Sequence, residues 1–300
     1  MTDAFMNQGF SGSWVAIVTP MHEDGRLDEK SFCALIDWHV ESGTDAIVVA
    51  GTTGEAPTLS FDEHLALVRL AVAHARGRIP IIAGTGSNCT REAIELTEGA
   101  AAAGAQAALV VTPYYNRPTQ EGLFLHFAAI ARATPLPLVL YNVPARTGVN
   151  ISDATVQRLA EFTTICGIKE ASGDIGRISS LLRLLPQGFA VFTGDDALAL
   201  PALAMGACGV ISVTANVCPR EMAALCSLAK NLDLAAARDI EKNLSALNQA
   251  LFFESNPIPV KWALARMGRI PPGIRMPLVP LSVPHHEALL AAMKISLVAV

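Results

Sequence analysis

Residues 164–174 read TICGIKEASGD, a short apolar run that ends in a lysine and a glutamate and then leads into a candidate helix. A β-branched run bounded by small, turn-forming residues is typical of a buried strand. Lysine is rarely buried, so a lysine at the end of such a run needs a physical reason. Either Lys169 reaches water where the strand ends, or it lies in a site that uses an amine.

The same unit, an apolar strand followed by an amphipathic helix, recurs along the chain. Helices are predicted to begin near Asp, Ser or Thr residues, and many of them end at glycine. The predicted strands are WVAIVTP from Trp14, AIVVAG from Ala46, PIIAGT from Pro80, AALVVTP from Ala107, LPLVLYNVP from Leu136, TICGIKEAS from Thr164, FAVFTG from Phe189 and CGVISVTAN from Cys208. The predicted helices begin near Asp28, Asp62, Arg91, Thr119, Ser152, Asp174, Asp196 and Pro219.

These strands are continuous apolar runs, which indicates parallel strands that are covered on both faces. Eight units of about 25–30 residues match the dimensions of a (β/α)₈ barrel, the TIM barrel. A doubly wound sheet is the alternative α/β fold. It usually has fewer strands and a glycine-rich first turn, which the segment WVAIVTPMHEDG lacks.

The pattern changes after residue 231. Three helical segments follow with no strand between them: DLAAARDIEKNLSALNQALFF, IPVKWALARMG and HEALLAAMKISL. The sequence therefore predicts a catalytic barrel over residues 1–231 and a C-terminal helical extension over residues 232–300. A proline-rich and hence rigid connector, IPPGIRMPLVPLSVP, lies within that extension.

Composition limits the class of protein. Hydrophobic residues make up 51% of the 300 residues and charged residues only 16%, which indicates a large core. The net charge is −5 and no basic stripe appears, which argues against a nucleic-acid surface. Six cysteines without a C-x-x-C pair predict buried, reduced thiols in a cytoplasmic protein. The N-terminus lacks the pattern of a signal peptide, and no apolar stretch approaches the roughly 20 residues of a membrane span.

The active site of such a barrel lies at the C-terminal ends of its strands, and Lys169 ends the sixth predicted strand. Burial in an apolar barrel mouth disfavours an ammonium ion. A neutral amine can attack a ketone and form an imine, which then acts as an electron sink for C–C chemistry. The alternative is a lysine just beyond the strand end that pairs with Glu170.

The segment GTTGE, residues 51–55, follows the second strand. Its two hydroxyls and two glycines suit a tight turn that aims N–H groups and threonine side chains at a small carboxylate. An ordinary turn between strand and helix is the alternative. A phosphate cradle is disfavoured because the lysine of the P-loop pattern is missing.

The segment YNVPARTG, residues 141–148, ends the fifth strand with a phenol and a guanidinium. Tyr141 can transfer protons, and Arg146 presents a planar fork that suits a second carboxylate. A core tyrosine and a solvated arginine are the alternatives. Tyr114 and Tyr115 also follow a strand, so all three tyrosines of the chain fall at predicted strand ends. The seven histidines show no metal-binding spacing beside a carboxylate.

With GTTGE, YNVPARTG and GIKEASGD placed on one rim, the chain resembles the dihydrodipicolinate synthase family of pyruvate-dependent class I aldolases, a superfamily that includes N-acetylneuraminate lyase. The resemblance covers roughly residues 12–297, and PYYNRPTQEGL, TGDDA, GVISVTANV and NPIPVKWAL favour the synthase branch over the lyase branch. It implies condensation of pyruvate with L-aspartate 4-semialdehyde to 4-hydroxy-tetrahydrodipicolinate, in diaminopimelate and lysine biosynthesis. It implies no cofactor beyond the covalent pyruvate imine itself.

The resemblance also implies roles for individual residues and a homotetramer built as a dimer of dimers. Tyr115 would be contributed across a subunit interface. The implied roles are imine formation for Lys169, proton donor and acceptor for Tyr141, proton relay for Thr52 and Tyr115, pyruvate carboxylate binding for Thr53, binding of the second substrate's carboxylate for Arg146, and lining of the pyruvate pocket for Ile211.

Many members of this family are inhibited by L-lysine at a subunit interface. Four residues match that effector site: His64, Asn88, Glu92 and Tyr114. Two positions depart from it, because Phe61 stands where sensitive members often carry histidine and Ala56–Pro57 replaces a common Ser-Ala pair. Inhibition by lysine is therefore a hypothesis for this chain.

Two alternative functions stay open. The first is another pyruvate-dependent aldolase or lyase that acts on a sugar acid or a hydroxy acid. Arg146 argues against it, because a neutral sugar-like chain has little use for a guanidinium. The second is a non-catalytic binding protein on the same barrel. The usual mark of such a protein is loss of the lysine or the tyrosine, and this chain keeps both Lys169 and Tyr141.

Overall fold

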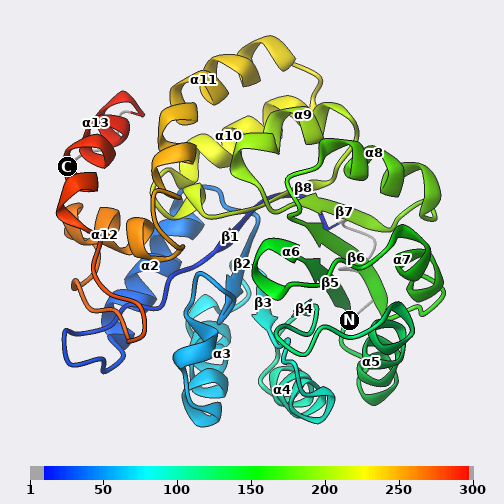
Figure 1. Ribbon diagram of the computed structural model, residues 1–300. Coiled ribbons are helices and arrows are strands. Elements are labelled where there is room, and N and C mark those ends of the chain that lie inside the picture. Colours follow the sequence, from blue (N-terminus) through cyan, green and yellow to red (C-terminus); the bar gives the residue numbers. More distant parts are fainter. Residues whose placement is uncertain (1–9, 297–300) are drawn as a thin grey trace.

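The computed structural model describes residues 10–296, and its centre is a closed barrel of eight parallel strands (Figure 1). Each strand pairs with the next, and β8 pairs with β1 to close the barrel. The strands are β1 Gly12–Ala16, β2 Ala46–Val49, β3 Ile81–Gly84, β4 Ala107–Val111, β5 Leu138–Asn142, β6 Ile165–Glu170, β7 Ala190–Thr193 and β8 Gly209–Ser212. The predicted TIM barrel is confirmed, and closure excludes the doubly wound sheet.

Helices surround the barrel, and four of them begin at a predicted capping residue, Asp28, Thr119, Ser152 or Asp174, whereas the helix predicted from Asp62 is capped by Ser60. The side chains of Asp28, Ser60, Thr119, Ser152 and Asp174 accept hydrogen bonds from the first turns of their helices. The helices are α2 Glu29–Glu41, α3 Phe61–Ala75, α4 Thr90–Ala102, α5 Gln120–Ala133, α6 Pro144–Thr147, α7 Asp153–Leu159, α8 Ile175–Leu184, α9 Ala199–Ala204, α10 Pro219–Lys230, α11 Leu234–Ala250, α12 Ile258–Arg266 and α13 His286–Ile295. Short 3₁₀ helices span Ala56–Thr58, Asp196–Leu198, Thr214–Asn216 and Val283–His285.

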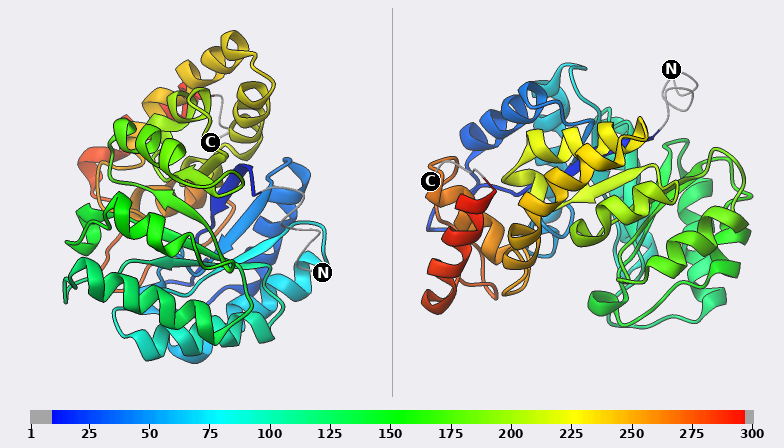
Figure 2. Two further views of the ribbon diagram at one scale, coloured as in Figure 1. Left: turned by 90° about the vertical axis from the view of Figure 1, so that its right-hand side faces the viewer. Right: turned by 90° about the horizontal axis from the view of Figure 1, so that it is seen from above.

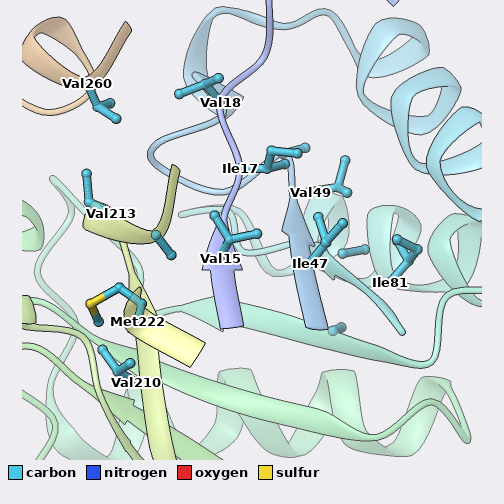
Figure 3. Close-up of a cluster of buried hydrophobic side chains, with 14 of the residues drawn as sticks. Val15, Ile17, Val18, Ile47, Val49, Ile81, Val210, Val213, Met222 and Val260 are labelled. Carbon is cyan, nitrogen blue, oxygen red and sulfur yellow. The ribbon is translucent and has the colours of Figure 1, made fainter. Parts of the chain in front are cut away.

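Side chains alternate along each strand between two separate cores. Val15 and Ile47 belong to the outer core, which lies between the strands and the helices (Figure 3). Their sequence neighbours Trp14 and Ala46 belong to the inner core, inside the barrel. This explains the continuous apolar runs in the sequence, because both faces of every strand are covered.

Strand β6 carries an irregularity that changes this alternation. Leu138 of β5 pairs with Ile165, but the next residue of β5, Val139, pairs with Gly167. Strand β6 therefore has one residue more than its neighbour at this point, which is the defining feature of a β-bulge. Cys166 is the extra residue, and it belongs to the inner core.

The C-terminal helices α11, α12 and α13 lie on one side of the barrel, next to α10 and to the N-terminal segment that carries α2 (Figures 1 and 2). Val260 of α12 joins the same outer core as Val15 (Figure 3). The three predicted helical segments are confirmed, whereas the domain boundary at residue 231 stays a prediction. Within residues 10–296, no helix combines the length and the apolar character that crossing a bilayer requires.

Two local expectations need correction. Tyr141 and Arg146 do not share one loop, because Tyr141 lies in β5 and Pro144–Thr147 form α6, which is capped by Gly148 with a φ of 72° that suits glycine. The six cysteines are free, but only half of them are buried: Cys166, Cys218 and Cys226 are buried, and Cys33, Cys89 and Cys208 are partly exposed. Burial raises the pKa of Cys166 and of Cys226 to about 12, so these two thiols stay protonated.

Candidate active site

Lys169 is buried at the C-terminal end of β6, with 5% of its surface exposed. It pairs with Tyr141 on one side and Phe192 on the other, and both of these residues belong to the inner core. Space for its side chain comes from Gly194, where a Cβ atom would lie 2.6 Å from the Lys169 Cε atom. The lysine therefore points into the barrel, and the alternative of a solvated strand end is wrong.

Glu170 points the opposite way and does not neutralise Lys169. Its carboxylate is 2% exposed and accepts hydrogen bonds from Arg177 Nε at 2.7 Å and from Asn142 Nδ2 at 3.0 Å. The backbone N–H of Ser172 donates a third bond at 2.8 Å. Glu170 thus links β5, β6 and α8 on the outer side of the barrel, where its carboxylate oxygens already have hydrogen-bond partners.

Tyr141 stands beside Lys169 on the neighbouring strand. The Lys169 Nζ atom lies 4.4 Å from the centre of the Tyr141 ring. Tyr141 is 8% exposed and borders a large cavity at the barrel mouth, so one side of its ring faces the lysine and another is open to a ligand. Ile211 of β8 is fully buried in the same inner core, where it pairs with Trp14.

The GTTGE segment forms a tight, fixed turn after β2. Ala50 and Glu55, at its two ends, have left-handed φ values of 53° and 57°. Thr52 borders the cavity, whereas Thr53 is 2% exposed and accepts a hydrogen bond from Asn256 Nδ2 at 3.0 Å. A strained turn that is held this firmly is not an ordinary connection, because such strain persists only where the surroundings enforce it.

Glu55, at the end of this turn, forms a buried ion pair with Lys261 of α12. A second oxygen of the Glu55 carboxylate accepts the backbone N–H of Arg275 at 3.1 Å. Burial lowers the pKa of Lys261, and the nearby Glu55 carboxylate opposes this shift. The C-terminal extension is therefore locked onto the loop that carries Thr52 and Thr53.

Arg146 lies on α6 at the rim, is exposed, and borders the same cavity. One of its guanidinium nitrogens, Nη2, donates a hydrogen bond to the backbone carbonyl of Asn256 at 3.2 Å. In the part of the chain that the structure describes, Arg146 forms no ion pair. Its charge is available to a ligand.

Tyr115 differs from the other site residues because its side chain lies at the surface. It is 90% exposed, has a left-handed φ of 71°, and donates its backbone N–H to the carbonyl of Thr147 at 3.3 Å. It does not border the cavity of its own chain, whereas Tyr114 does. The sequence brings both tyrosines to the end of β4, and the structure brings only Tyr114 to the site.

The cavity has a volume of about 820 Å³, and Tyr141 is one of the residues that line it, whereas Lys169, Thr53 and Ile211 are not. Thr52, Tyr141 and Arg146 border it, and a second group of lining residues, here called the outer wall, consists of His64 of α3, Glu92 of α4 and Tyr114 after β4. His64 Nε2 lies 2.6 Å from the carbonyl oxygen of Gly84, and Glu92 accepts a hydrogen bond from Ser87 at 2.9 Å. Phe61 and Pro57 add apolar surface to the outer wall.

One predicted effector residue, Asn88, does not border the cavity, and its carbonyl instead accepts a hydrogen bond from Asn116 Nδ2 at 2.8 Å. Among residues 10–296, no three His, Cys, Asp or Glu side chains come together as metal ligands would. The arrangement is a buried amine beside a phenol, with hydroxyl and guanidinium groups for anions, and such a set suits imine chemistry on an anionic ketone.

Three residues at the site escaped the sequence analysis. The sequence indicates no role for Gly194 beyond the end of the predicted strand FAVFTG, and none for Asn256 and Lys261 within NPIPVKWAL. A polar residue directly before an apolar helical segment and a lysine inside it are the signal that indicates burial with a partner. Their partners are more than 200 residues away, at Thr53 and Glu55.

Comparison with known proteins gives a consistent result. The model of the "Dihydrodipicolinate synthetase family" matches residues 9–296. The 4-hydroxy-tetrahydrodipicolinate synthase of Thiobacillus denitrificans is 57% identical over 94% of this chain and 96% of its own length, and that of Nitrosomonas eutropha is 59% identical over 95% and 97%. The crystal structure of a chloride-inhibited dihydrodipicolinate synthase from Acinetobacter baumannii, complexed with pyruvate, superposes with a TM-score of 0.95 at 52% identity and covers 96% of this chain and 99% of its own.

Proposed function

This chain belongs to the dihydrodipicolinate synthetase family, and we propose that it catalyses that family's reaction through an imine on Lys169. Its activity is that of its close relatives, 4-hydroxy-tetrahydrodipicolinate synthase. The observation that carries the mechanism is the position of Lys169, buried inside the barrel mouth with its nitrogen 4.4 Å from the Tyr141 ring. The substrates are pyruvate and L-aspartate 4-semialdehyde.

The reaction begins when the Lys169 amine attacks the ketone carbon of pyruvate and water leaves. Tyr141 moves protons in these steps and takes part in converting the imine to an enamine, which requires a proton to leave the pyruvate methyl group. The enamine carbon then forms a C–C bond with the aldehyde of the second substrate. Attack of that substrate's amine on the imine carbon closes the ring and releases Lys169 as a free amine.

Two separate groups bind the two carboxylates. Thr53, together with the backbone around Thr52, binds the carboxylate of pyruvate, and Thr52 also takes part in the proton relay. Arg146 at the rim binds the carboxylate of the semialdehyde, since its guanidinium is exposed to the cavity and has no acidic partner in the described chain. Ile211, buried in the inner core, forms the apolar wall of the pyruvate pocket.

Self-association is part of this proposal. A tyrosine with 90% of its surface exposed is unusual on a lone subunit, so Tyr115 is suited to enter the site of a neighbouring subunit and complete the relay there. We therefore assign a homotetramer, built as a dimer of dimers. A cytoplasmic location also belongs to the proposal, supported by six free cysteines.

The decisive experiment traps the imine. The protein is incubated with pyruvate, reduced with borohydride, and digested for mass spectrometry. The expected adduct is on Lys169 alone. Lys261 provides an internal control, because it is the other buried lysine but is held in an ion pair with Glu55. Absence of an adduct, or an adduct on any other lysine, would overturn the mechanism.

The Arg146 guanidinium also distinguishes this function from that of a pyruvate aldolase acting on a sugar acid or hydroxy acid, because it suits a second substrate that carries a carboxylate. A steady-state assay should give turnover with L-aspartate 4-semialdehyde and little with sugar-acid or hydroxy-acid substrates. Preference for one of the latter would replace the second substrate but leave the imine chemistry intact.

Binding of L-lysine in the outer part of the cavity is a separate proposal. His64, Glu92 and Tyr114 on the outer wall support it, while the apolar Phe61 and Pro57 reduce the polar surface that an amino acid needs. Isothermal titration with L-lysine, run beside kinetics, tests it. No heat together with unchanged kinetics would remove the effector site.

A further inference from the structure

Asn256 touches both groups that the proposed function assigns to carboxylates. Its side-chain Nδ2 donates to Thr53 Oγ1 at 3.0 Å, and its backbone carbonyl accepts from Arg146 Nη2 at 3.2 Å. It is 5% exposed and lies just before α12, in the C-terminal extension and outside the barrel strands. One buried residue therefore connects the two halves of the substrate site.

The direction of the bond to Thr53 matters. A threonine hydroxyl has one proton to donate. Because Thr53 Oγ1 accepts from the amide of Asn256, this proton stays free to be donated to another acceptor. If an acceptor oxygen stood in place of the amide nitrogen, the hydroxyl would donate its proton to that oxygen and could no longer donate it to a bound anion. The Asn256 Oδ1 atom is buried and has no partner among the described residues, so it is turned away from this bond.

Asn256 is itself held in place. Lys261, in the first turn of the following helix α12, forms the buried ion pair with Glu55, two residues beyond Thr53. The segment from Asn256 to Lys261 thus contacts the Thr53 loop at two points. A residue anchored in this way orients its partner without a large loss of side-chain entropy.

We infer that Asn256 is a positioning residue that keeps the Thr53 hydroxyl as a hydrogen-bond donor to the pyruvate carboxylate and holds Arg146 at the rim. The inference rests on the proposed function, since it takes the pyruvate-binding role of Thr53 from there. It adds a contribution of the C-terminal extension to substrate binding that the barrel alone does not supply.

The test compares two substitutions at this position. Asn256→Asp keeps the size of the side chain but presents acceptor oxygens and a negative charge to Thr53, and Asn256→Ala removes the bond. The KM for pyruvate should rise about tenfold to hundredfold in Asn256→Asp and less in Asn256→Ala. At saturating pyruvate, borohydride should still trap the adduct on Lys169, since the amine is unchanged.

A double variant with Thr53 shows whether Asn256 acts by orienting the Thr53 hydroxyl or by a general effect on the site. In a Thr53→Val background, the further change Asn256→Asp should leave the KM for pyruvate within about twofold, because the hydroxyl that Asn256 orients is gone. Independent, multiplying effects of the two changes would overturn the inference. So would an unchanged KM in Asn256→Asp.

Asn248 provides the matched control. It is also 5% exposed and lies in the C-terminal extension, but its side chain bonds to Thr214 at 2.7 Å and to the carbonyl of Asp196 at 3.3 Å. Asn248→Ala should lower the thermal midpoint as Asn256→Ala does, yet leave the KM for pyruvate unchanged. An equal rise of the KM for pyruvate in both variants would mean that Asn256 contributes only to the stability of the fold. Failure of wild-type protein to form the Lys169 adduct would instead reject the proposed function.

Discussion

The side-chain nitrogen of Lys169 lies 4.4 Å from the ring centre of Tyr141, and the two residues are direct partners across β6 and β5. Their pairing means that the amine and the phenol are fixed by the barrel itself, without relying on a mobile loop. A site built on neighbouring strands holds its reacting groups more precisely than one built on loops.

Tyr141→Phe should separate the two roles of this tyrosine. The ring that packs beside Lys169 stays, so the pyruvate adduct should still form on borohydride treatment. The proton donor is lost, and kcat should fall about 10²- to 10⁴-fold. Stopped-flow or steady-state kinetics with both substrates measure the fall. Wild-type turnover in this variant would assign the proton transfer to another group.

Gly194→Ala should displace the Lys169 side chain sterically while leaving its amine chemically unchanged. The added Cβ would lie 2.6 Å from Lys169 Cε and 2.7 Å from Ala171 Cβ, so the lysine has to move. We expect loss of most of the adduct and of activity while circular dichroism stays native. Gly176→Ala is the control, because within 4 Å its Cβ would meet only Asp174, the capping residue of α8, at 3.1 Å, and would not meet Lys169.

Lys261→Met should strongly destabilise the protein, because it leaves the Glu55 carboxylate buried with only the Arg275 backbone N–H as partner. Breaking one side of a buried pair costs about 3–5 kcal/mol. The double variant Glu55→Gln/Lys261→Met should recover much of this loss. Denaturant midpoints at one protein concentration provide the measurement, and equal stability of the single and double variants would contradict it.

Two buried histidines should make the protein sensitive to mild acid. Burial lowers the pKa of His39 to about 3 and that of His126 to about 4. Unfolded histidine has a pKa of about 6.5, so between pH 6.5 and 4 the unfolded chain binds protons that the folded chain does not. Stability therefore falls as the pH drops, by about 2 kcal/mol per histidine between pH 7 and 5.

His126→Gln tests this dependence directly. The change in unfolding free energy between pH 7 and pH 5 should be about 2 kcal/mol smaller in the variant than in wild type. Urea unfolding at the two pH values measures it. An identical pH dependence in both proteins would show that burial does not lower the pKa of His126 below its unfolded value.

Tyr115→Phe should lower activity strongly although the side chain lies outside the site of its own chain. The hydroxyl is needed for the relay if the ring enters a neighbouring subunit. Sedimentation should give the same oligomer as wild type, since the apolar ring is kept. Full activity of this variant would remove Tyr115 from the relay, whatever the oligomeric state.

The strands could be predicted because both of their faces are covered, which makes them continuous apolar runs that stand out from the helices. Lys169, Tyr141 and the GTTGE turn could be placed on one rim because parallel strands in a barrel end on the same side. Asn256 could not be placed there. Its contacts with Thr53 and Arg146 depend on how the C-terminal helices fold back, and no local pattern encodes that path.

Alternation along β6 does not predict that the Lys169 side chain points into the barrel. A strict alternation from the inward-facing Cys166 predicts Lys169 on the outer side of the barrel and Glu170 on the inner side. The structure has them the other way round, because β6 carries one extra residue. Bulges of this kind depend on pairing with the neighbouring strand, which is a non-local property.

Which of the two charged residues at the end of β6 faces the substrate consequently depends on the one-residue offset between β5 and β6. If β6 instead paired without this offset, with Cys166 opposite Val139, Lys169 would stand opposite Asn142 and face the outer side of the barrel, and Glu170 would face the inner side. An acid would then face the ketone, and a lysine would face the Arg177 guanidinium, where like charges repel. A change of strand pairing alone, with the sequence untouched, would therefore turn an amine catalyst into an inert, poorly folded barrel. Deletion of Cys166 would by contrast keep Lys169 opposite Tyr141.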